Sequence, residues 1–132
     1  MDRSVIMNLQ EYITEEMTAE LIYKELARMA PCEQDRQLLL EFAEDERNHA
    51  EDFKKIYRNM TGRRYEPTIM PIVLTQPYRE ILRERVLDES GDFRKYGEQY
   101  LMTQPSELKD VFYLARTDEG VHAWRLLYLL SK

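Results

Sequence analysis

The amino-acid sequence predicts an all-α fold, a four-helix bundle of two antiparallel hairpins joined by a long crossover. The 132 residues include only 4 glycines, with 43% hydrophobic and 33% charged residues, a composition typical of a helix-rich globular protein. Apolar residues recur at alternating steps of three and four in four stretches. The second half also repeats the first at an offset of 73 residues, which maps His122 onto His49. We therefore expect a single domain over residues 1–132.

The first hairpin is expected to contain helices at about 4–30 and 33–60. Pro31 lies between them, because proline starts a helix well and continues one badly. Pro31 is 15 residues from both Glu16 and Glu46, so antiparallel helices would place these two carboxylates at the same height. The seam of the first helix is Leu9, Ile13, Glu16, Glu20, Tyr23, Ala27 and Ala30, and that of the second is Leu39, Phe42, Glu46, His49, Phe53, Ile56 and Met60.

The second hairpin is expected to contain helices at about 77–102 and 106–130, with Pro105 in the turn between them. The stretch from Thr61 to Pro77 holds a glycine and three prolines, so it predicts the extended crossover instead of a helix. The seam of the third helix is Leu82, Val86, Glu89, Phe93, Tyr96 and Tyr100, and that of the fourth is Leu108, Phe112, Ala115, Glu119, His122, Leu126 and Leu129.

Both histidines of the chain close the same hexapeptide, Asp-Glu-x-x-His-Ala, at residues 45–50 and 118–123. Residues three apart lie on one face of a helix, so each Glu-x-x-His can direct a carboxylate and an imidazole at one point. Each half also has a seam glutamate 30 residues before the glutamate of its motif, Glu16 in the first half and Glu89 in the second. The predicted metal ligands are Glu16, Glu46, His49, Glu89, Glu119 and His122.

Buried carboxylates are expensive unless they are protonated or neutralised. The seams offer no lysine or arginine opposite these glutamates, which leads us to expect divalent metal. Carboxylate and imidazole ligands without a thiolate favour iron or manganese, with zinc as an alternative.

Four more residues have two interpretations each. Glu20 and Asp92 lie one turn beyond Glu16 and Glu89, and each is either an extra ligand or a surface charge. Tyr23 and Tyr96 are core tyrosines that are also candidates to hydrogen-bond a ligand carboxylate near the catalytic site.

Charge and composition exclude several classes of function. A net charge of −6 argues against binding to nucleic acid. No apolar stretch reaches the length of a membrane span, and the N-terminal residues show no cleavage motif, so we expect a cytoplasmic protein without a membrane partner. The lone Cys32 excludes an internal disulfide and a paired-cysteine metal module. The apolar run from Trp124 to Leu130 predicts either a homodimer interface or core packing.

With these residues in place, the chain resembles the ferritin-like di-iron carboxylate superfamily, and most closely rubrerythrin. The segment Glu16-Met-Thr-Ala19-Glu-Leu-Ile-Tyr23 is similar to the rubrerythrin pattern Glu-x-x-Ala-x-x-x-Tyr, and Asp-Glu-x-x-His-Ala is similar to that of its second helix. The resemblance implies that Glu46 and Glu119 bridge or flank two iron ions, that Glu16 and Glu89 are terminal ligands, and that each histidine binds one ion. Asp92 falls where rubrerythrin-type proteins have an additional glutamate.

The resemblance implies a di-iron oxidoreductase that reduces hydrogen peroxide. Rubrerythrins proper have a rubredoxin domain with paired cysteines, whereas this sequence has one cysteine, so we expect an external reductant such as a rubredoxin-like protein. The alternatives are oxygen-dependent iron oxidation and storage, manganese-dependent peroxide dismutation, and a non-enzymatic, metal-stabilised helical interaction module.

Overall fold

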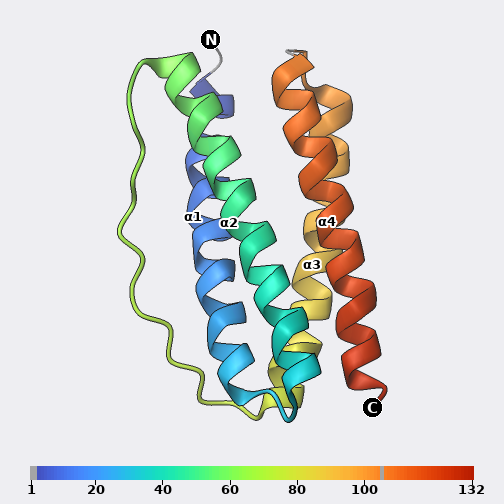
Figure 1. Ribbon diagram of the computed structural model, residues 1–132. Helices are drawn as coiled ribbons and strands as arrows, with labels where there is room; N and C mark the ends of the chain where they lie inside the picture. Colours follow the sequence, from blue (N-terminus) through green and yellow to red (C-terminus); the bar gives the residue numbers. More distant parts are fainter. Residues whose placement is uncertain (1–2, 105) are drawn as a thin grey trace. The chain divides into compact units, whose positions relative to one another are not determined.

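The computed structural model describes residues 3–104 and 106–132 and contains four helices (Figure 1). Within these residues there is no β-strand. The helices are α1 Arg3–Met29, α2 Glu33–Thr61, α3 Tyr78–Met102 and α4 Ser106–Leu130. Helix α1 begins and ends one residue before the expected range, α2 ends one residue later, and α3 begins one residue later. The expected turn residue Pro105 lies outside the described residues.

The chain divides into two compact units, one up to Leu74 and one from Thr75 onward. Helices α1 and α2 pack against each other in the first unit, and α3 and α4 pack against each other in the second. The expectation of a single domain remains a prediction. No helix in the described part of the chain combines the length and apolar character that crossing a membrane requires.

The ends of α2 explain how the first hairpin is delimited. Cys32 precedes α2 in an extended conformation, and the first turn contains Glu33 and Asp35, whose negative charges favour a helix N-terminus. At the other end, Gly62 has φ 72° and its N–H donates to the carbonyl of Arg58 at 2.8 Å. Only glycine adopts this left-handed conformation without strain, so Gly62 ends the helix.

The core of the first hairpin follows the seams predicted from the sequence. Tyr23 and Phe42 are fully buried and meet edge to face, with ring centroids 5.4 Å apart. Tyr12 packs against Phe53 at 5.7 Å. The other buried apolar residues of α1 and α2 are Leu9, Ile13, Ala19, Leu26, Ala27, Leu39, Ala43, Ala50, Ile56 and Tyr57.

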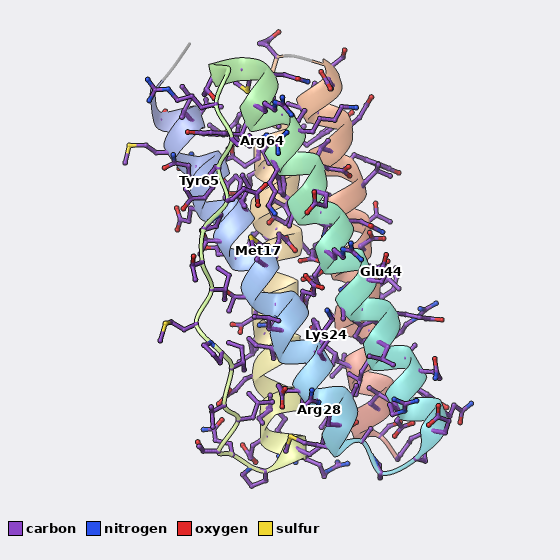
Figure 2. The ribbon with its side chains drawn as sticks, turned by 60° about the vertical axis from the view of Figure 1, so that its left-hand side comes forward. Met17, Lys24, Arg28, Glu44, Arg64 and Tyr65 are labelled. Carbon is purple, nitrogen blue, oxygen red and sulfur yellow. The ribbon has the colours of Figure 1, made fainter. Side chains whose placement is uncertain are left out.

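The segment from Arg63 to Leu74 has no helix or strand and runs along the first hairpin (Figure 1). Tyr65, labelled in Figure 2, lies near the start of this segment and contacts both helices of the hairpin. The Tyr65 hydroxyl lies 3.2 Å from Thr14 Oγ1 of α1, and its ring packs against Tyr57 of α2 at 5.8 Å. Lys54 of α2 adds an ion pair with Glu66 at 2.9 Å.

In the second hairpin, the buried seam residues are Ile81, Leu82, Tyr96, Leu108, Phe112, Ala115, Ala123, Leu126 and Leu129. Lys109 of α4 donates to the carbonyl of Tyr100 at 2.6 Å, which places a cation at the C-terminal end of α3. Gly120 of α4 is buried against α3, where an added Cβ would lie 2.8 Å from the ring of Phe93. This contact shows that the two helices approach closely beside Glu119.

Candidate metal centre

The first hairpin brings together Glu16 of α1 with Glu46 and His49 of α2. All three are buried, with at most 3% of each residue exposed. His49 Nδ1 lies 3.4 Å from Glu16 Oε2 and 3.4 Å from Glu46 Oε1. The ligand atoms that these residues offer all lie within 4.8 Å of one another. Residues 33 positions apart in the sequence, Glu16 and His49, are therefore directed at one point.

The second hairpin repeats this arrangement with Glu89 of α3 and with Glu119 and His122 of α4. His122 Nδ1 lies 3.3 Å from Glu89 Oε2 and 3.4 Å from Glu119 Oε1. The three residues are buried, and their ligand atoms also lie within 4.8 Å of one another. Offset by 73 residues, the two clusters use the same side chains, and equivalent contacts differ by 0.1 Å at most.

The donor set of each cluster fits a hard or borderline divalent cation. Such an ion binds oxygen and nitrogen at about 2.0–2.2 Å, so two donors on opposite sides of one ion are roughly 4 Å apart. The separations within each cluster are of this size, and each cluster supplies two carboxylates and one imidazole without a thiolate. Iron and manganese both suit this chemistry.

The structure places Glu20 and Asp92 outside both clusters. Glu20 pairs with Lys24, one turn further along α1, at 2.7 Å. Asp92 pairs with Lys95 on α3 at 3.2 Å. Lys24, labelled in Figure 2, has a half-exposed side chain. The side chains of Glu20 and Asp92 are 17% and 28% exposed, and the choice between an extra ligand and a surface charge stays a prediction for both.

Tyr23 and Tyr96 are both fully buried. Tyr23 packs on Phe42, as described above, and Tyr96 packs on Phe112 with ring centroids 5.9 Å apart. Lys95 also places its ammonium 4.8 Å from the centre of the Tyr96 ring. Both residues are therefore core tyrosines, and a role in hydrogen-bonding a ligand remains a prediction.

One residue beside the second cluster contradicts the expectation that no lysine or arginine accompanies the seam glutamates. Arg85 is buried, with 7% of the residue exposed, and its guanidinium contacts Glu89 at 2.7 Å. Sequence reasoning missed Arg85 because the seam was traced through apolar residues and glutamates. The spacing of four residues places Arg85 and Glu89 on one helix face, but by itself it does not distinguish a buried pair from an exposed one.

Burial and neighbouring charged groups shift the pKa values of two residues on α2. Burial raises the pKa of Asp52 above its usual range, although nearby Lys55 acts in the opposite direction. Partial burial lowers the pKa of Lys54, but its hydrogen bonds to Glu66 and Glu51 outweigh this effect, so the net pKa is raised.

Comparison with known proteins places this geometry in context. Residues 7–130 match the rubrerythrin family. The chain is 30% identical over 135 residues to a Bacillus subtilis (strain 168) protein named "Uncharacterized protein YhjR", covering 99% of this chain and 90% of that one. The fold of the present chain is similar to that of a solved structure, "Hypothetical Protein Pfu-1136390-001" from Pyrococcus furiosus, with a TM-score of 0.73. That alignment has 19% identity and covers 93% and 88% of the two chains.

The fold is that of a ferritin-like four-helix bundle, which confirms the all-α class predicted from the sequence, and the matching family is a ferritin-like di-iron family. Within that class, the chain belongs to the rubrerythrin family.

Proposed function

We propose that this protein is a di-iron oxidoreductase that reduces hydrogen peroxide with electrons from an external donor. The observation that supports it most strongly is the duplicated Glu-Glu-His cluster, buried and convergent in each hairpin. Membership of the rubrerythrin family supports the use of two iron ions. Manganese or zinc are the alternatives for the same donors.

In this proposal, His49 and His122 each bind one ion, and Glu16 and Glu89 act as terminal ligands. Glu46 and Glu119 would supply further carboxylate ligands to the ions. When bound, iron would supply the redox chemistry, in which hydrogen peroxide, two protons and two electrons from the external donor become two molecules of water. The carboxylates neutralise the charge of the ions, and the surrounding apolar seam limits access of bulk water.

Tyr23 and Tyr96 have a supporting role in the proposal. Their buried rings hold the helices in register beside the ligands, and their hydroxyl groups are proposed to hydrogen-bond ligand carboxylates. Such bonds would fix the orientation of a carboxylate without contacting the metal. Tyr23→Phe and Tyr96→Phe are therefore expected to keep both ions while slowing the reaction.

The proposed partners are peroxide, an external reductant such as a rubredoxin-like protein, and a second copy of the chain. The homodimer is supported by α4, which exposes Trp124, Leu127 and Tyr128 while burying Leu126 and Leu129. Scattered exposed apolar residues are common, so the dimer needs its own measurement. Light scattering coupled to size-exclusion chromatography should give twice the chain mass of 15.9 kDa.

The experiment that tests the function is stopped-flow oxidation of the ferrous protein. We expect anaerobically loaded protein to be oxidised faster by hydrogen peroxide than by an equal concentration of oxygen. A variant of an exposed α2 residue, Glu44→Ala, serves as the control and should behave as the wild type. Faster oxidation by oxygen would instead favour iron oxidation and storage, and metal binding without redox turnover would favour a structural module.

A further inference from the structure

The two oxygens of Glu89 have different neighbours. Arg85 donates from Nη2 to Glu89 Oε1 at 2.7 Å, whereas Glu89 Oε2 faces His122 Nδ1 at 3.3 Å. The guanidinium also reaches Asp88 at 3.1 Å through Nη1. The side chain of Arg85 is 9% exposed and that of Glu89 is fully buried, whereas that of Asp88 is 62% exposed. The interaction with Glu89 is therefore a buried, charge-assisted hydrogen bond to a predicted metal ligand.

The internal repeat provides a comparison for this contact. The offset that maps Glu89 onto Glu16 and His122 onto His49 maps Arg85 onto Tyr12. Tyr12 is also buried, and its ring packs against Phe53. The histidine–glutamate distances are alike in the two clusters. The second hairpin therefore has the same ligand geometry as the first, but it has the permanent cation of Arg85 where the first has the neutral phenol of Tyr12.

A permanent cation changes the energetics of metal binding at Glu89. Arginine stays protonated throughout the pH range in which proteins fold. Its hydrogen bond stabilises the buried carboxylate while no metal is bound. A divalent ion approaching Glu89 is repelled by the guanidinium and meets a carboxylate whose charge is already partly compensated. Both effects favour the metal-free state.

We propose that Arg85 is a built-in counter-ion of the second cluster. It stabilises the metal-free arrangement of Glu89, Glu119 and His122, and it lowers the affinity of this cluster for a divalent cation. The affinity would be higher with a neutral residue at position 85. Arg85 is a positioning residue, since it acts through Glu89. The inference rests on the proposed metal binding and adds a determinant of how strongly one of the two ions is held.

The test is a titration of the full chain, stripped of metal by a chelator, with Co²⁺ alone. Calorimetry and visible absorption follow binding, and thermal melting follows stability. Arg85→Met should tighten one binding event about tenfold, equivalent to ~1.4 kcal/mol, and leave the other unchanged. Without metal, Arg85→Met should melt at a lower temperature than the wild type, because a buried carboxylate loses its cation. Saturating Co²⁺ should narrow this difference.

Two further variants separate charge from structure. Arg85→Gln can still donate a hydrogen bond to Glu89 but is neutral, so it should tighten binding as Arg85→Met does even if the methionine variant folds poorly. Arg83→Met is the matched control on the same helix, since the Arg83 side chain is 52% exposed and pairs with Glu80. Its binding of Co²⁺ should equal that of the wild type.

The outcomes distinguish this inference from the proposed function. If the wild type binds two Co²⁺ ions and both neutral variants bind them equally or more weakly, the counter-ion role of Arg85 is refuted and the metal centre stands. If neither the wild type nor the variants bind Co²⁺, both proposals fail together.

Discussion

Replacing Gly120 by alanine is expected to lower the free energy of unfolding, because the structure leaves no room for a side chain at this position. Gly120 follows Glu119 directly on α4 and is buried against α3. In Gly120→Ala, the new Cβ would lie 2.8 Å from Cδ2 and 3.1 Å from Cε2 of Phe93. Carbon atoms pack favourably at about 3.5–4.0 Å, so the ring or the helix must move. The guanidinium of Arg116 lies 4.3 Å from the centre of this ring and restricts its movement.

The expected net effect is a loss of stability. Overpacking of this kind costs roughly 1–3 kcal/mol, whereas replacing glycine by alanine within a helix gains up to about 1 kcal/mol. We therefore expect Gly120→Ala to lower the free energy of unfolding by ~1 kcal/mol. The matched control is Gly91→Ala on α3, where an added Cβ meets nothing within 4 Å. That variant should raise the free energy of unfolding by about 0.5–1 kcal/mol.

Urea denaturation of the metal-free proteins, followed by circular dichroism, measures both changes. A second readout is Co²⁺ affinity, which should fall in Gly120→Ala because displacement of α4 moves Glu119 and His122 away from Glu89 on α3. Gly91→Ala should leave it unchanged. If Gly120→Ala were as stable as Gly91→Ala, the close approach of α3 and α4 at Phe93 would be wrong.

Two predictions concern charged contacts on α2. Lys54→Met removes the ion pair to Glu66 and should free the segment that follows α2, at a cost of about 0.2–1 kcal/mol because Glu66 is exposed. Faster amide hydrogen exchange over residues 64–74 would show this, and an unchanged rate would contradict it. Hydrogen bonds from Arg36 and then Gln37 lower the pKa of Glu33 from 4.5 to about 2. Because the folded-state pKa is depressed, the stabilisation is complete above pH 4.5 and is lost as the pH falls toward 2. An NMR titration of the Glu33 carboxyl group should find this low midpoint, and Arg36→Met should return it toward 4.5. A normal midpoint in the wild type would refute the pairing.

Periodicity was sufficient to predict the fold class because the apolar residues and the site residues share the same seams. The steps of three and four that place Leu39 and Phe42 in the core also place Glu46 and His49 there. The repeat then pointed to Glu89, Glu119 and His122 as the equivalent side chains, and the structure brings these three together.

Arg85 was not predictable in the same way, because arginine at a spacing of four from an acid is common on exposed helix faces. Arg94 and Glu98 have this spacing on the same helix, and both side chains are largely exposed. Which pair is buried depends on the packing around α3. The long aliphatic stem of arginine also tolerates burial that a sequence pattern does not reveal.

The position of the close approach between helices was likewise not predictable from sequence. Gly91 and Gly97 both lie within α3, so the presence of a glycine does not by itself mark such a contact. The structure shows α3 as a continuous helix with open space at Gly91. An added Cβ at Gly97 would lie 3.2 Å from Arg116 Nε, and one at Gly120 on α4 would lie closer still, 2.8 Å from Phe93. Such a contact depends on the distance between helices and on the orientation of Phe93, neither of which follows from residue spacing.

The most direct test of the metal centre is the iron content of protein reconstituted anaerobically with excess ferrous iron and then desalted. The account predicts two equivalents of iron per chain, and loss of both in Glu46→Ala combined with Glu119→Ala. The control combines Glu44→Ala with Glu107→Ala, which changes exposed glutamates on the same two helices and should retain both equivalents. Two equivalents of iron in the first double variant, or none in the wild type, would contradict the assignment of the ligands.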